Sequence, residues 1–134
     1  MNVGDRILEV ELGREVAVGT TVETAGRIFL TLRARLGRWI GVDAFDALMD
    51  RAITEGRSVH AVLARARWIP DGNPPLSGLD LPDTPEATAS LRAAVVAILD
   101  KITALLGRFI GDDLASRLVM QDWEAPGTGP QEDP

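Results

Sequence analysis

Two arginines, Arg38 and Arg108, occupy the same position in a seven-residue pattern that the chain carries twice. The pattern is Gly-Arg-aromatic-Ile-Gly-x-Asp, which stands at residues 37–43 and returns seventy positions later at 107–113. A guanidinium binds carboxylate or phosphate through two parallel hydrogen bonds, and the N-terminus of a helix also attracts anions. If the two copies of the pattern meet, the paired arginines would form a small-anion site between them.

The same pattern also has a purely structural interpretation, which we favour. A glycine such as Gly41 or Gly111 can end a helix with a positive φ, and the aspartate that follows can cap the next helix. An arginine in the last turn complements the negative end of the helix dipole. The sequence therefore predicts a sharp corner between two helices at both places, with the anion site as the alternative role of the arginines.

His60 is the only histidine in the chain. On a helix that starts near Ser58, it would face away from the apolar side and be exposed. A lone exposed histidine in a helical bundle invites comparison with phosphotransfer domains. Those domains carry a Lys-Gly pair where this chain has Leu63 and Ala64. We therefore interpret His60 as a surface residue.

The acidic residues argue against nucleic acids and metal ions as partners. In a helix-turn-helix interpretation, the helix entering the DNA groove would carry Asp43, Asp46 and Asp50, and the net charge of the chain is −6. Affinity for nucleic acid requires a basic surface instead. Neither long helix contains the Glu-x-x-His pair of a di-metal centre in a bundle, so the three aspartates predict a solvated face.

The sequence contains none of the common catalytic motifs. It has no Gly-x-x-x-x-Gly-Lys loop for phosphate, no Gly-x-Ser-x-Gly turn and no His-Glu-x-x-His motif. It also has no cysteine, which excludes thiol nucleophiles, thiolate metal sites and disulfides. We therefore predict that the chain is not an enzyme and that it holds no cofactor and no metal.

The composition is that of an acidic helical protein. Hydrophobic residues make up 46% of the 134 residues, with three Trp, three Phe and no Tyr, and this is typical of packed helices. No apolar run approaches the roughly 18 residues of a membrane span, and the first residues do not resemble a secretory signal. We expect a cytoplasmic protein, and the preference for arginine over lysine suggests a bacterial source.

Apolar residues recur at three- and four-residue spacing in two segments, which predicts two long helices. Their apolar stripes are Val22, Ala25, Phe29, Leu32, Leu36 and Trp39 in the first segment, and Leu91, Val95, Leu99, Ile102, Leu106 and Phe109 in the second. Thr20 with Glu23 predicts a capping box at the start of the first helix, and Thr84 followed by Pro85 predicts the start of the second.

Shorter helices are expected after each corner and from Ser58 onward. Five prolines between Ile69 and Pro85 predict a loop, whose leucines should lie against the body of the protein. Residues 6–18 are ambiguous, because Leu8, Val10 and Leu12 alternate as in a strand whereas Val3, Ile7 and Val10 would share one face of a helix. We prefer a β-hairpin there. Residues 125–134 are expected to form a disordered tail.

These observations predict an all-α, four-helix-bundle-like domain built from a duplicated helical hairpin with approximate two-fold symmetry. The domain would span residues 1–124, with copies at about 20–55 and 85–124 and a proline-rich connection at 69–85. As its function we favour a non-catalytic protein–protein interaction or regulatory adaptor module, with a homodimer as one arrangement. The aromatic residues proposed as interface anchors are Trp39, Trp68, Phe109 and Trp123. The alternative is a small-anion or ligand sensor that uses Arg38 and Arg108, and we expect neither nucleic acid nor membrane as a partner.

Overall fold

The computed structural model describes residues 3–12, 17–79 and 81–121. In this part of the chain it contains five α-helices, one short 3-10 helix and one antiparallel pair of short strands. In chain order the elements are α1 (Val3–Leu12), α2 (Val18–Ile40), α3 (Val42–Gly56), η1 (Ala61–Leu63), β1 (Arg67–Trp68), β2 (Leu76–Ser77), α4 (Pro85–Ile110) and α5 (Asp112–Met120). The predicted helical class is therefore confirmed. The predicted tail at 125–134 lies outside the described residues.

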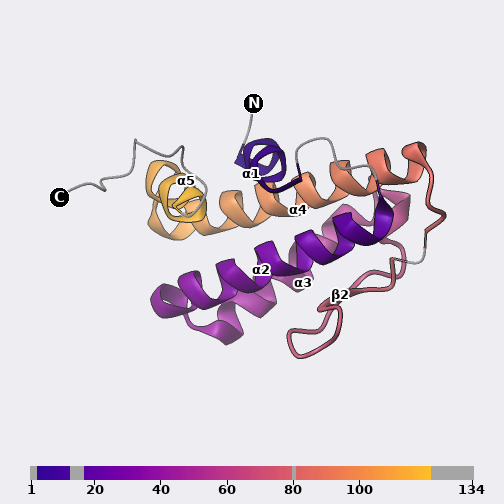
Figure 1. Cartoon of the computed structure of the whole chain (residues 1–134). Helices are drawn as coiled ribbons and strands as arrows, with labels where there is room; N and C mark the ends of the chain where they lie inside the picture. The colour runs from indigo at the N-terminus through magenta and orange to yellow at the C-terminus, as the bar shows by residue number, and fades with distance from the viewer. Residues whose placement is uncertain (1–2, 13–16, 80, 122–134) are drawn as a thin grey trace.

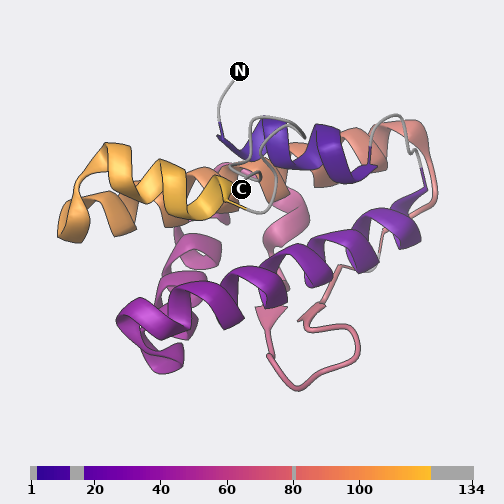
Figure 2. The ribbon, with the colours of Figure 1, turned by 60° about the vertical axis from the view of Figure 1, so that its left-hand side comes forward.

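The longest helix, α4, lies in the middle of the molecule (Figures 1 and 2). The other long helix, α2, runs beside it in the same direction, and α3 turns back from the end of α2 and packs on both. On the other side of α4 lies α1, and α5 turns back from the end of α4. None of the helices in the described residues has both the length and the apolar character to cross a bilayer.

Most of the apolar stripe predicted for α2 lies in the core, but Trp39 at its end is 66% exposed, and the helix begins earlier than predicted. Ala25, Phe29, Leu32 and Leu36 are fully buried. The capping box at Thr20 is wrong, because the helix starts at Val18 and no side chain of its own caps it. Instead the Val18 amide donates to Oδ1 of Asp83 at 3.2 Å, so the loop before α4 supplies the acceptor that a helix N-terminus needs.

The start of α4 agrees with the prediction, and so does its apolar stripe except for Phe109, which is 76% exposed. Thr84 caps the helix, accepting a hydrogen bond from the Ala87 amide at 3.1 Å, and Pro85 is its first residue. The buried stripe consists of Leu91, Val95, Leu99, Ile102 and Leu106.

Both predicted helix corners are present and have nearly the same backbone geometry. Gly41 has φ 89° and ψ 146°, and Gly111 has φ 93° and ψ 146°. A side chain would be strained at this positive φ. The predicted capping role of the aspartates is wrong, because the glycines themselves are the N-caps and no side chain caps either helix. The aspartates instead lie in the first turn, where they complement the helix dipole.

Residues seventy positions apart in the two long helices are buried alike. Ala25 and Val95, Phe29 and Leu99, Leu32 and Ile102, and Leu36 and Leu106 are all in the core. The surroundings of the two helix pairs differ, however. The α3 helix packs closely on both α2 and α4, whereas α5 packs mainly on α4 and touches α1 and α2 only lightly.

At the N-terminus the predicted hairpin is wrong in the described residues, because residues 3–12 form α1. Gly4, Ile7 and Leu8 are buried at helical spacing, while Val10 is 63% exposed. The helix lies so close to α4 that a Cβ on Gly4 would come within 2.6 Å of the carbonyl oxygen of Val96. The Gly4 amide also donates to Asp100 Oδ1 at 2.9 Å. Residues 13–16 of the predicted hairpin lie outside the described part.

The third helix predicted from Ser58 is also wrong. The chain there forms only η1 and then β1, in which Arg67 and Trp68 pair with Ser77 and Leu76 of β2. Arg57 stabilises this segment, because its guanidinium donates to the carbonyl of Leu63 at 3.2 Å and to that of Ala66 at 2.8 Å. The proline-rich segment lies against the body as predicted, since Leu76 is fully buried.

Glu55 of α3 pairs with two cations, Arg51 of the same helix and Lys101 of α4, and the second pair joins α3 to α4. Its carboxylate accepts from Arg51 Nε at 2.8 Å and from Lys101 Nζ at 2.9 Å. These hydrogen bonds, from Arg51 first and then from Lys101, lower the pKa of Glu55 from 4.5 to about 2. Because these side chains are largely exposed, solvent and salt weaken their effect on stability.

Glu55→Gln should therefore lower stability only at pH values where Glu55 is ionised. Since the pKa is lower in the folded state, the wild-type advantage is complete above about pH 4.5 and is lost as the pH falls toward about 2. Urea unfolding midpoints measured across this range should converge in acid. Glu23→Gln, the same change at an exposed position beyond the first turn of α2, controls for the loss of one negative charge. A wild-type advantage that persists undiminished in acid would contradict the assignment.

Candidate functional site

The corners between α2 and α3 and between α4 and α5 lie at the same end of the molecule (Figures 1 and 2). Trp39 and Phe109, which stand at equivalent positions before the two corner glycines, are 66% and 76% exposed. Val42 and Leu114 follow the same glycines and are also exposed. Of the eight large hydrophobic side chains exposed in the described residues, these four lie at the two corners. We call them the aromatic end.

Charged residues of both signs flank the aromatic end. Arg38 and Arg108 are exposed in the last turns of α2 and α4, and neither forms a salt bridge within the described part of the chain. Asp43, Asp112 and Asp113 are exposed in the first turns of α3 and α5. Each corner therefore presents an aromatic ring, a cation and at least one carboxylate.

The other two proposed anchors are placed differently. Trp68 is only 8% exposed, and its ring meets Phe29 and Phe45 edge to face at centroid distances of 6.1 and 6.3 Å. It is a core residue, and the aromatic end does not include it. Trp123 lies outside the described residues.

Asp46 of α3 forms hydrogen bonds to α2 and to β1, and the sequence pattern did not indicate this role. Arg33 of α2 donates to it through Nε at 2.9 Å and Nη2 at 3.0 Å, and the indole nitrogen of Trp68 donates at 2.8 Å. Burial raises the pKa of Asp46, but these hydrogen bonds and the charge of Arg33 outweigh it and bring the pKa below its usual 3.8. Asp46 is thus a structural centre and not part of a solvated acidic face.

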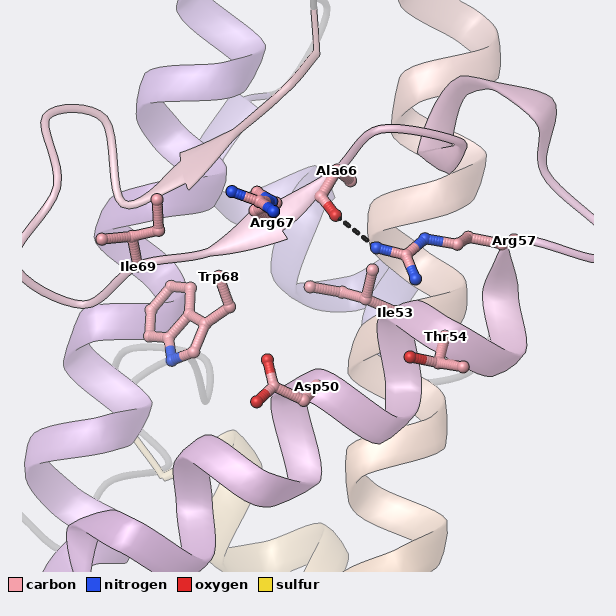
Figure 3. A pocket seen from close by; sticks show the side chains of 8 residues that line it. All are labelled: Asp50, Ile53, Thr54, Arg57, Ala66, Arg67, Trp68 and Ile69. Atoms are coloured by element: carbon pink, nitrogen blue, oxygen red, sulfur yellow. Dashed lines mark hydrogen bonds between the residues drawn. The ribbon is translucent and has the colours of Figure 1, made fainter.

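A cavity of about 320 Å³ lies between the second half of α3 and the segment 66–69. Figure 3 shows Asp50 and Thr54 of α3 facing it from one side, Arg67 and Trp68 of β1 from another, and Arg57 near its edge. The side chains of Asp50, Thr54 and Arg67 make no hydrogen bond or ion pair with any residue that the structure describes. No local sequence pattern indicates this cavity, because it exists only where η1 and β1 replace the helix predicted from Ser58.

His60 is half-buried beside a second cavity of about 450 Å³, which Glu55, Val59 and Lys101 also line. A third cavity of about 590 Å³ lies among α1, α4 and α5. Arg38 and Arg108 line none of these three cavities, so an anion site at this pair remains a prediction. Within the described residues, no group of three His, Asp or Glu side chains is arranged to hold a metal ion.

Comparison with known proteins assigns the chain to no family. No family model, curated protein or solved structure matches the chain. The aromatic end and the cavities are therefore the features that bear on its function.

Proposed function

We propose that this chain is a non-catalytic protein–protein interaction module that pairs with a second copy of itself through the aromatic end. The observation that carries the proposal is the exposure of Trp39 and Phe109 at the same end of the molecule. The large apolar side chains exposed at the two corners leave apolar area in water, which burial against a partner would remove. Aromatic residues and arginine are also the residue types that most often dominate binding energy at interfaces.

A second copy suits this surface because the surface is self-complementary. A two-fold dimer buries the same patch on both subunits, so each patch must supply groups that attract those of its copy. Each corner supplies an aromatic ring for stacking, an arginine and an aspartate. The arginines of one subunit would face the aspartates of the other around a core of aromatic contacts.

We also propose that the chain arose by duplication of a helical hairpin, with α2–α3 and α4–α5 as the copies of a bundle-like core. The matched burial of residues seventy apart and the common torsion angles of Gly41 and Gly111 support this origin. Duplication would also account for an aromatic residue at both corners.

Sedimentation equilibrium tests the proposed dimer. The wild type should dimerise with a dissociation constant in the micromolar range or below, corresponding to about 8 kcal/mol or more. Trp39→Ser/Phe109→Ser should be monomeric while keeping its helical circular dichroism, because both side chains are mostly exposed. Val59→Ser removes a side chain that is 75% exposed and lies outside the aromatic end, and it should still dimerise.

Two results would contradict the proposal. One is a wild type that stays monomeric at concentrations near 1 mM. The other is a double variant that dimerises as tightly as the wild type.

A further inference from the structure

We draw no further inference here: the strongest candidate, the cavity of about 450 Å³ beside His60 between the end of α3 and α4, carries nothing, because its charged groups Glu55 and Lys101 already pair with each other at 2.9 Å and nothing in the structure shows what covers its apolar rim at Val59.

Discussion

Asp46→Ala is expected to lower the free energy of unfolding by about 2–3 kcal/mol. The substitution removes the acceptor of three hydrogen bonds and leaves the Arg33 guanidinium and the Trp68 indole N–H without it. Trp68 is shielded from water, being only 8% exposed, and the Arg33 side chain is partly shielded at 29% exposed. A shielded donor that loses its acceptor keeps the full penalty of desolvation. The stability lost is therefore larger than the net contribution of the hydrogen bonds themselves. Urea unfolding of both proteins at neutral pH measures the loss.

The pH dependence separates this effect from simple loss of packing. Because the pKa of Asp46 is lowered in the folded state, its contribution is complete above the usual value of 3.8 and is lost as the pH falls through the folded value. The difference between wild type and Asp46→Ala should therefore shrink in acid. Asp50→Ala, one turn further along α3, should cost less than about 0.5 kcal/mol. Equal losses at Asp46 and Asp50 would contradict the role of Asp46.

The sequence predicts the long helices well because their signals are local. These signals depend only on neighbouring residues. As predicted, Phe29, Leu32 and Leu36 are buried, and α4 begins at Pro85 with Thr84 as its cap. The same spacing continues through Trp39 and Phe109, yet these two are exposed. Periodicity shows which face of a helix a residue occupies. It does not show whether the core extends that far along the axis.

The predictions that failed depend on contacts between distant residues. Alternation of Leu8 and Val10 fits a strand, but the packing of Gly4 on Val96 and its hydrogen bond to Asp100 favour a helix. No local pattern contains that contact. The segment after Ser58 likewise carries apolar residues at helical spacing, and its pairing with β2 overrides them.

The candidate sites were predictable only in part, because they too depend on contacts between residues that are distant in the sequence. Trp39 and Phe109 could be named as anchors from their types, but the buried Trp68 could not be distinguished from them. The Asp46 network joins residues 13 and 22 positions apart, and neither spacing has a meaning within a single helix. The cavity near Asp50 follows from a chain path that the sequence did not indicate.

The largest losses of stability should come from the central leucines of the two long helices. Leu36→Ala and Leu106→Ala are each expected to lower the free energy of unfolding by about 2–5 kcal/mol, through lost apolar burial and the cavity left behind. Both residues are fully buried at equivalent positions, so the two losses should be similar. Chemical denaturation measures each of them.

A leucine with different surroundings provides a matched control. Leu30 on α2 is 38% exposed and lies outside the aromatic end, and its replacement by alanine should cost less than about 1 kcal/mol. A loss at Leu36 or Leu106 no larger than at Leu30 would mean that the pair does not lie in a packed core. If only one of the two substitutions lowered the free energy of unfolding by this amount, the two helix pairs would contribute unequally to the core. The proposed duplication would then not be supported by the stabilities of the variants.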